Sequence, residues 1–390
     1  MTLFLLSFFL VYGGVHLYAF LKLRAALHPG PAGKALILAF MTLMVLAPVI
    51  IRQAEKHSLD VLGRALSYVG YSWMGFLFLF FSAAFAIDLL RLLLSVGTAV
   101  FPAQVPPGVI SPRTAFFIPL AMSAVTGVYG FFEAADIRSE RVTIATDKVP
   151  EEVGRVTIAQ ISDVHIGLIV REERLKKILG KVRDANPDIL VSTGDLVDGQ
   201  INQLDGLSEL FREIRPTYGM FAITGNHEFY AGLDQALDFT GRAGFTLLRG
   251  EAVDIGGFLT IAGVDDPTVE YYGGKGNEVE STILRQAPEG RFTVLLKHRP
   301  LVDRASDGLF DLQLSGHVHK GQIYPFSLLT RLYYPVYAGM ARTQGGSILY
   351  VNRGSGTWGP PMRVLAPPEV TIIELVNPRG KGESAPPESR

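Results

Sequence analysis

Long apolar runs dominate the first third of the chain. They cover residues 2–20, 35–51, 68–87 and 115–132, and each approaches the roughly 20 residues that a helix needs to cross a bilayer. The first run does not look like a secretory signal, because its basic residues, Lys22 and Arg24, follow it rather than precede it. The pattern therefore predicts an α-helical membrane bundle of four spans in residues 1–134, making the protein an integral, multi-pass membrane protein.

Charge is distributed in agreement with this division. Of the 73 charged residues, 12 lie in residues 1–134 and 61 in the remaining 256. The net charge of −1 argues against a nucleic-acid partner, which would call for a basic excess. The chain has no cysteine, which excludes thiolate metal ligands and a cysteine nucleophile.

The first loop between apolar runs indicates the orientation. It carries Lys22, Arg24 and Lys34 without an acidic residue, so the positive-inside rule places it in the cytoplasm. After four spans, the C-terminal domain would then lie on the non-cytoplasmic side, although the remaining loops are almost balanced in charge. We expect the bundle to act as an anchor; His16, Asp88 and Arg91 are the polar residues on which a lipid-binding role would depend.

Short β-branched runs alternate with amphipathic segments after residue 152. Runs at 156–161, 189–192 and 220–223 are separated by helical patterns at 171–185 and 204–214. Further short runs follow at 259–262, 293–296, 312–314, 347–351 and 370–375. We expect an α/β domain at 153–377, built as a two-sheet β-sandwich flanked by helices. Residues 135–152 are expected to form a linker and 378–390 a disordered tail.

All the histidines of this second domain lie directly after predicted strands. Together with Gly194-Asp195, which also follows a predicted strand, they give the motifs Asp163-Val164-His165, Gly225-Asn226-His227-Glu228, His298 and Gly316-His317-Val318-His319. Since ligands gather at the carboxyl ends of strands in open α/β sheets, these side chains are candidates for one site.

Imidazole together with carboxylate is a ligand set for Mn, Fe or Zn. Two such ions about 3.5–4 Å apart bind a phosphate between them and activate water. A carboxylate can bridge two ions through its two oxygens, which makes Asp195 the natural bridging ligand. Gly194, Gly225 and Gly316 would let the backbone approach the ions closely.

The five motifs in this order resemble the calcineurin-like metallophosphoesterase superfamily over residues 153–376. Three finer features, His298-Arg299-Pro300, Gly321-Gln322 and residues 354–361, resemble its membrane-associated YkuE/YaeI-type branch. Transmembrane proteins with a metallophosphoesterase domain share the layout of apolar runs followed by this domain.

The resemblance implies a role for each matching residue. The first metal would be held by Asp163, His165 and His319, the second by Asn226, His298 and His317, and both by Asp195. His227 would not bind metal but would protonate the leaving oxygen, while a hydroxide bridging the metals attacks phosphorus. Mn²⁺ is the first expectation for both ions, with Fe or Zn as alternatives. Glu228 and Lys320 depart from residues common in the family, without removing a ligand.

These inferences predict a membrane-anchored, metal-dependent phosphoric ester hydrolase, preferably a phosphodiesterase, acting on a lipid- or envelope-linked phosphate. The alternatives are a phosphomonoesterase or pyrophosphatase with a soluble substrate, a membrane sensor or transporter with a regulatory phosphoesterase domain, and a non-catalytic scaffold. Arg342, Arg353 and Trp358 are candidate substrate contacts. The apolar stretch 324–337 either packs on the core or meets the bilayer or an acyl chain. The sequence leaves the oligomeric state open.

Overall fold

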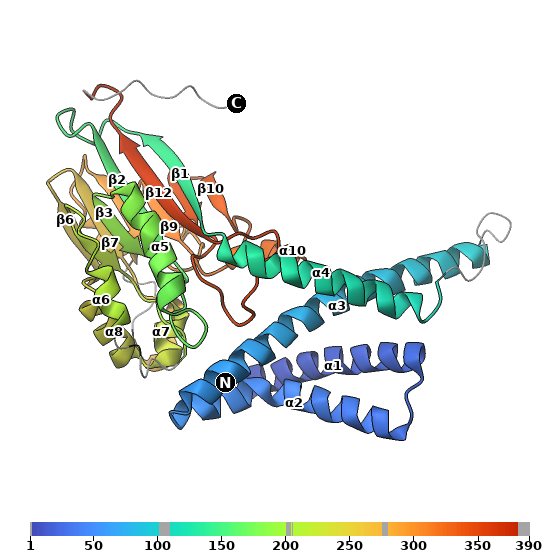
Figure 1. Ribbon diagram of the computed structural model, residues 1–390. Helices are drawn as coiled ribbons and strands as arrows, with labels where there is room; N and C mark the ends of the chain where they lie inside the picture. Colours follow the sequence, from blue (N-terminus) through green and yellow to red (C-terminus); the bar gives the residue numbers. More distant parts are fainter. Residues whose placement is uncertain (1, 101–109, 200–203, 205, 275–279, 381–390) are drawn as a thin grey trace. The chain divides into compact units, whose positions relative to one another are not determined.

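The computed structural model describes residues 2–100, 110–199, 204, 206–274 and 280–380 (Figure 1). The chain divides into two units. The helical unit comprises residues 1–132 together with 359–364, and the soluble unit comprises 133–358 and 365–390. The chain therefore passes from one unit to the other three times.

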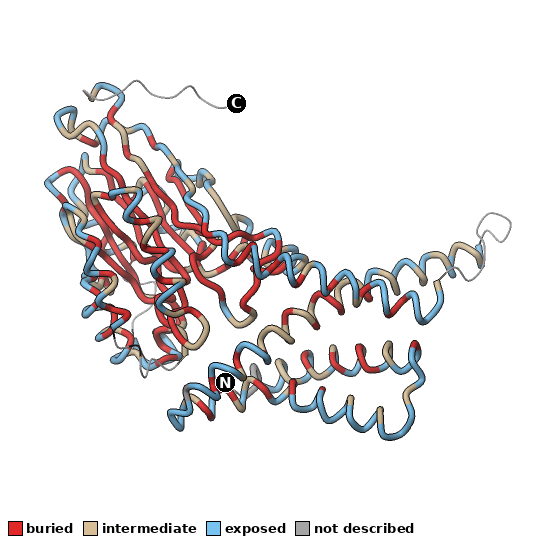
Figure 2. The backbone as a smooth tube through the Cα atoms, in the orientation of Figure 1, coloured by how far each residue is buried: buried red, intermediate tan, exposed pale blue. Residues whose placement is uncertain are grey.

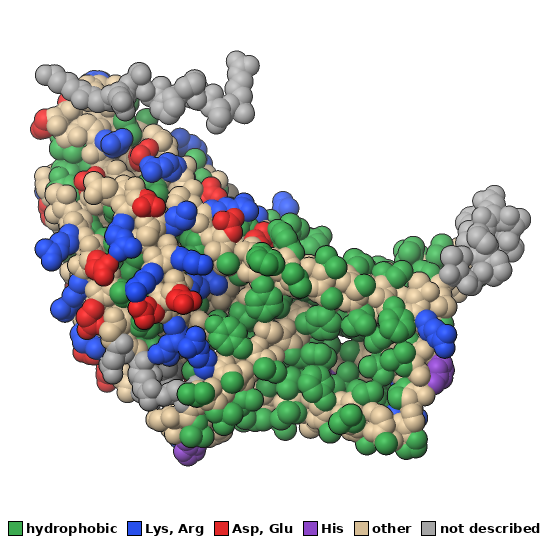
Figure 3. Space-filling view, in the orientation of Figure 1, with side chains coloured by type: hydrophobic (Ala, Val, Ile, Leu, Met, Phe, Trp, Pro, Cys, Tyr) green, Lys and Arg blue, Asp and Glu red, His purple; other side chains and the backbone are tan. Residues whose placement is uncertain are grey.

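The helical unit consists of long apolar helices whose surfaces are largely exposed (Figures 2 and 3). They are α1 (Thr2–Leu27), α2 (Pro31–Lys56), α3 (Asp60–Val100) and α4 (Thr114–Ala135). All four are long and apolar enough to cross a membrane, which confirms the predicted helices. Helix α3 is twice as long as its apolar run, because Asp88 and Arg91 interrupt the hydrophobicity without ending the helix.

The polar residues within this unit bind one another. The Nε1 group of Trp73 donates to Nε2 of His16 at 2.9 Å, and Nδ1 of His16 lies 2.9 Å from the carbonyl oxygen of Tyr12. Asp88 forms an ion pair with Lys22 and accepts a hydrogen bond from Tyr18. Such mutual satisfaction of polar groups is what an anchoring bundle requires.

Within the residues that the structure describes, the soluble unit forms two six-stranded sheets. In spatial order, the first sheet has β1 (Arg138–Ala145), β12 (Glu369–Val376), β2 (Arg155–Ile161), β3 (Ile189–Ser192), β4 (Met220–Ala222) and β5 (Thr246–Leu247). The second has β10 (Gly339–Arg342), β11 (Ile348–Val351), β9 (Leu312–Ser315), β8 (Phe292–Leu296), β7 (Leu259–Gly263) and β6 (Glu251–Ile255).

The sheets face each other across a core of aliphatic residues, which confirms the two-sheet sandwich. Ile158 and Val191 of the first sheet share this cluster with Val294 and Leu314 of the second, and all four are fully buried. Helices cover the outer faces: α5 (Glu172–Ala185), α6 (Leu207–Phe211) and α8 (Leu233–Arg242) on the first sheet, and α9 (Glu280–Arg285) on the second.

The prediction that residues 135–152 form a linker is corrected by the structure, because this segment contains strand β1. Residues Arg138–Ala145 pair in parallel with Glu369–Val376 along the whole strand. The strand lies at the edge of the sheet and is mostly exposed, so it lacks a continuous apolar run. The predicted tail lies outside the described residues from position 381 onward.

Candidate metal centre

The predicted ligands converge because five parallel strands end beside one another. Strands β2, β3 and β4 are parallel neighbours in the first sheet, as are β8 and β9 in the second. Their carboxyl ends carry the five motifs, with Asn226 and His227 at the start of α7 (Asn226–Ala231).

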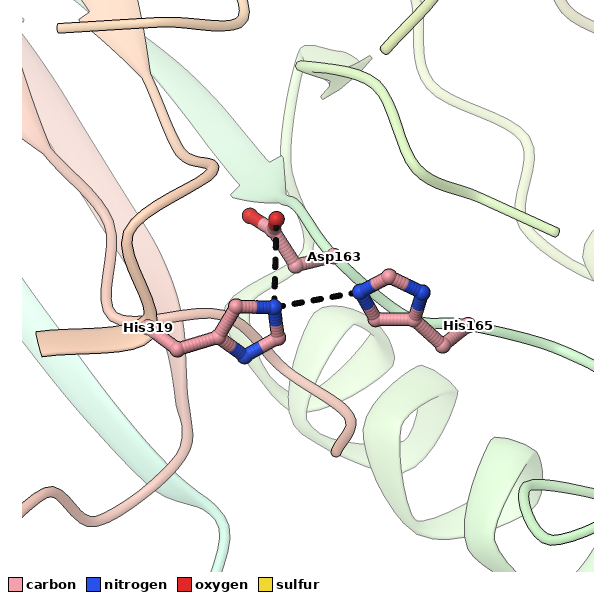
Figure 4. A group of neighbouring side chains, drawn as sticks. All are labelled: Asp163, His165 and His319. Carbon is pink, nitrogen blue, oxygen red and sulfur yellow. Dashed lines mark hydrogen bonds and ion pairs between the residues drawn. The ribbon is translucent and has the colours of Figure 1, made fainter. Parts of the chain in front are cut away.

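Asp163, His165 and His319 form one group of potential ligands (Figure 4). The Nε2 atom of His319 lies 3.4 Å from Oδ1 of Asp163 and 3.1 Å from Nε2 of His165. All three residues are buried. Their nitrogen and oxygen atoms point at one place, as ligands of a common ion would.

Asp195, His298 and His317 form a second group. The Nε2 atom of His298 lies 3.3 Å from Oδ2 of Asp195 and 3.2 Å from Nδ1 of His317. On its other side, Nδ1 of His298 donates to the carbonyl oxygen of Thr193 at 2.8 Å. This hydrogen bond leaves Nε2 of His298 as the ligand atom.

Asp195 also lies within ligand distance of His165 and His227, whose ring atoms complete a third group. Its Oδ2 is 3.8 Å from Nε2 of His165. Because Asp195 is shared between groups, its position fits the bridging role that the resemblance implies.

Divalent cations fit this set of donors. The Oδ1 atom of Asn226 is buried and has no hydrogen-bond partner among the described residues, which is costly unless an ion binds it. Two imidazole nitrogens, from His165 and His319, face each other at 3.1 Å beside carboxylates. Residues Asp163, His165, Asp195, Asn226, His298, His317 and His319 would hold the ions.

The backbone at the ligands is strained. Asp163, His165, Asp195, His317 and His319 all have left-handed conformations, with φ values of 51°, 54°, 52°, 72° and 47°. Non-glycine residues adopt this region at a cost, and such strain gathers at functional sites. The cost is consistent with selection for ligand position rather than for stability.

Two glycines are required by close packing around the ligands, as the sequence predicted. A Cβ atom on Gly225 would lie 2.2 Å from Oδ1 of Asp195. One on Gly316 would lie 2.2 Å from Oδ2 of Asp163. Any side chain at either position would displace a ligand.

Glu228, at a position where this chain departs from the family pattern, has a structural function. Its Oε2 accepts the N–H groups of Asp195 at 3.0 Å and Gly225 at 2.7 Å. Its Oε1 accepts those of Leu196 at 2.8 Å and Val197 at 3.3 Å. One buried carboxylate therefore fixes the loop that carries Asp195, the expected bridging ligand.

Asp198 is a site residue that the sequence analysis missed. Its Oδ1 lies 2.7 Å from Nδ1 of His227, and 3.8 Å from Nδ1 of His165. The available signal was a carboxylate three residues after Asp195 in the same loop. The contact with Asp198 orients the ring of His227 through Nδ1, so that Nε2 is the ring nitrogen left to interact with a substrate.

Electrostatics separate His227 from the ligand His165. Burial would lower the pKa of His227, but Asp195 and Asp198 raise it to about 9. Burial lowers the pKa of His165 to about 3, with the charge on His227 adding to the effect. These opposite shifts favour a protonated His227 and a neutral His165 at neutral pH.

The three candidate substrate contacts are placed differently. The ring of Trp358 is half exposed and its centroid lies 6.1 Å from that of His227. Arg353 is engaged by Glu140 at 2.5 Å and Glu369 at 2.6 Å. Arg342 ends β10 opposite Ile348, at the start of β11, so it lies at the other end of the strands from the metal ligands.

Comparison with known proteins agrees with this geometry. A family model described as calcineurin-like phosphoesterase matches residues 156–321. An uncharacterized metallophosphoesterase of Aquifex aeolicus is 40% identical over 263 residues, which are 67% of this chain and 99% of that protein. The uncharacterized metallophosphoesterase YkuE of Bacillus subtilis is 32% identical, over 66% of this chain and 93% of that protein.

A relative with transmembrane segments is also similar. A transmembrane protein with metallophosphoesterase domain from Danio rerio is 31% identical over 66% of this chain, which spans 61% of that protein. With the four candidate membrane helices, this similarity supports a membrane localisation. By its motifs, its fold and these relatives, the chain belongs to the calcineurin-like metallophosphoesterases.

Proposed function

We propose that the protein is a membrane-anchored, two-metal phosphodiesterase whose substrate is a lipid- or envelope-linked phosphate. The observation that carries the proposal is the convergence of three groups of histidine and aspartate at the ends of five strands. The orphaned amide oxygen of Asn226 adds a further ligand in the same place.

Each residue has a defined part in this proposal. When bound, two divalent cations neutralise phosphate charge and acidify water at neutral pH. Asp195, which is shared between the groups of potential ligands, would contribute to holding both ions. His227, oriented through Nδ1 by Asp198, donates the proton on Nε2 to the leaving oxygen.

The charge around the site favours a diester over a monoester. Arg299 is bound to both oxygens of Asp266, at 2.8 and 2.9 Å, and Arg353 is bound to Glu140 and Glu369. The charges of these two guanidinium groups are therefore already paired with carboxylates of the protein. A phosphodiester has one negative charge, so it needs fewer additional cations than a phosphomonoester dianion.

Hydrolysis of a phosphomonoester is the second candidate, and Lys320 is the observation in its favour. This lysine directly follows His319 and is half-buried. A Lys320→Gln variant tests the two candidate activities. If the protein is a phosphomonoesterase, the variant hydrolyses monoesters more slowly than the native protein. If it is a phosphodiesterase, the variant hydrolyses diesters at the native rate.

The proposal is tested by metal content and hydrolysis in the purified full-length protein. We expect about two equivalents of metal with Mn²⁺, Fe²⁺ or Zn²⁺, and faster cleavage of bis-nitrophenyl phosphate than of nitrophenyl phosphate. The Asp195→Asn variant should lose both metal and activity. Full activity in Asp195→Asn, or no metal in the native protein, would contradict the proposed centre.

We further propose that the soluble domain lies on the non-cytoplasmic side. The absence of cysteine makes a direct test possible, since one cysteine introduced at the exposed Tyr271 would be the sole thiol. A membrane-impermeant maleimide should label it in intact cells. Labelling only after lysis would place the domain in the cytoplasm.

A further inference from the structure

Helix α10 (Phe326–Tyr333) exposes its apolar side and turns its polar side toward the domain. No residue of the helix is buried. Ser327 and Thr330 are half-buried, whereas Leu328, Leu329 and Leu332 are 56%, 59% and 84% exposed. This is the reverse of a helix that packs on a soluble core. We call the exposed residues Phe326, Leu328, Leu329, Leu332 and Tyr333 the α10 face.

The α10 face adjoins the metal centre at both ends of the helix. The 3₁₀ turn His319–Gly321, which contains a ligand, precedes the helix by four residues, and Gly321 lies against Ser327. Tyr334 follows the helix and is buried, with its ring centroid 5.8 Å from that of His317. Whatever covers the α10 face therefore lies at the rim of the site.

Hydrogen bonds and the continuous chain link this rim to the helical unit. Gln322 bonds twice to the backbone of Trp358, at 2.7 and 2.9 Å. The next residue, Gly359, begins the 359–364 segment that belongs to the helical unit. At the other connection, only Asp136 and Ile137 separate α4 from β1. Gln322, which shortly precedes α10, is thus hydrogen-bonded to the residue after which the chain enters the helical unit.

We propose that the α10 face inserts into the bilayer that the helical unit spans. The composition suits the boundary between headgroups and acyl chains: leucines enter the hydrocarbon, Tyr333 and the exposed Trp358 favour the interface, and Arg331 pairs with lipid phosphate. A phosphate carried by a lipid then reaches the metals without leaving the membrane. This last step rests on the proposed function, whereas the insertion itself does not.

Insertion is tested by a depth-dependent fluorescence measurement on the full-length protein. Leu332→Cys and Tyr271→Cys, at positions 84% and 89% exposed, are each labelled with a polarity-sensitive dye. The proteins are reconstituted in vesicles of phosphatidylcholine and phosphatidylglycerol that contain nitroxide-labelled lipid. We expect lipid quenching and a blue shift at position 332 and neither at position 271.

Equal quenching at both positions would overturn the proposal. A dye at position 332 that is blue-shifted but not quenched by lipid would also overturn it, because protein rather than lipid would then cover the helix. Neither result depends on catalysis.

A kinetic comparison tests the consequence for substrate. Leu328→Glu/Leu332→Glu should lower hydrolysis of a fluorogenic diacyl phosphodiester in vesicles by roughly tenfold, since charged residues oppose insertion. Hydrolysis of bis-nitrophenyl phosphate should be unchanged, and Tyr271→Glu should affect neither reaction. An unchanged vesicle reaction would refute the role of α10 in substrate access. Absence of all hydrolysis in the native protein would instead refute the proposed function, with the quenching result still deciding insertion.

Discussion

At the residue scale, Glu228 shows how one buried carboxylate can position another, the candidate metal ligand Asp195. Each of its oxygens accepts two backbone N–H groups. In Glu228→Gln, the amide must direct its NH₂ group at two of these donors, whichever way it is turned. We expect a loss of about 1–3 kcal/mol in unfolding free energy for each unpaired group, and weaker metal binding.

Calorimetric unfolding and metal titration of Glu228→Gln measure the two effects. Glu209→Gln, on the surface helix α6, is the matched control for the loss of one negative charge. If Glu228→Gln kept native metal affinity, the carboxylate would not be positioning the Asp195 loop.

Asp198 is expected to act through His227. In Asp198→Asn, Nδ1 of His227 loses the anionic acceptor that now lies 2.7 Å away, so the ring is no longer held with Nε2 toward the substrate. We expect kcat on bis-nitrophenyl phosphate to fall by about 10²–10³, with KM and metal content near native values. Loss of metal in this variant would show instead that Asp198 supports the ligand His165.

At the element scale, strand β1 should be needed for a stable sheet. A shortened chain that begins at residue 153 loses the strand that pairs with all of Glu369–Val376, leaving β12 as an exposed edge. Compared with a chain that begins at residue 133, it should unfold at a lower temperature and aggregate faster. Thermal unfolding followed by light scattering measures both. Equal stability of the two chains would show that β1 contributes nothing to the sheet.

The same strand illustrates what the sequence could predict. The central strands β2, β3, β8 and β9 are buried on both faces, so they read as continuous apolar runs. Edge strands such as β1 and β10 carry exposed and charged residues, and pairing reveals them only in three dimensions. The candidate ligands could be located from the sequence because each follows the end of a strand in the interior of a sheet. Asp198 was missed because its role depends on the ring of His227, which comes from another loop.

At the scale of the whole molecule, the chain runs directly from the metal centre into residues 359–364, which belong to the helical unit. Just before this segment, Ser355 and Gly356 donate backbone hydrogen bonds to Ser162 and Asp163, at 2.8 and 3.0 Å. Within the helical unit, Met362 is almost fully buried and its Sδ lies 2.8 Å from the Cβ that Gly75 lacks. The segment 354–361, which resembles a family motif, is thus divided. Its first part is hydrogen-bonded to the loop that carries Asp163, and its last three residues belong to the helical unit.

A chain lacking residues 1–132 should therefore fold but self-associate. Met362 and Val364, which are 1% and 6% exposed in the whole chain, lose the helices that cover them, at about 1.5–3 kcal/mol for each side chain. We expect oligomers by light scattering after size-exclusion chromatography, and a larger monomer fraction in Met362→Gln/Val364→Thr. Hydrolysis of bis-nitrophenyl phosphate should be the same in both shortened chains. A shortened native sequence that stays monomeric would contradict the packing of this segment in the helical unit, because its apolar side chains would then need no cover.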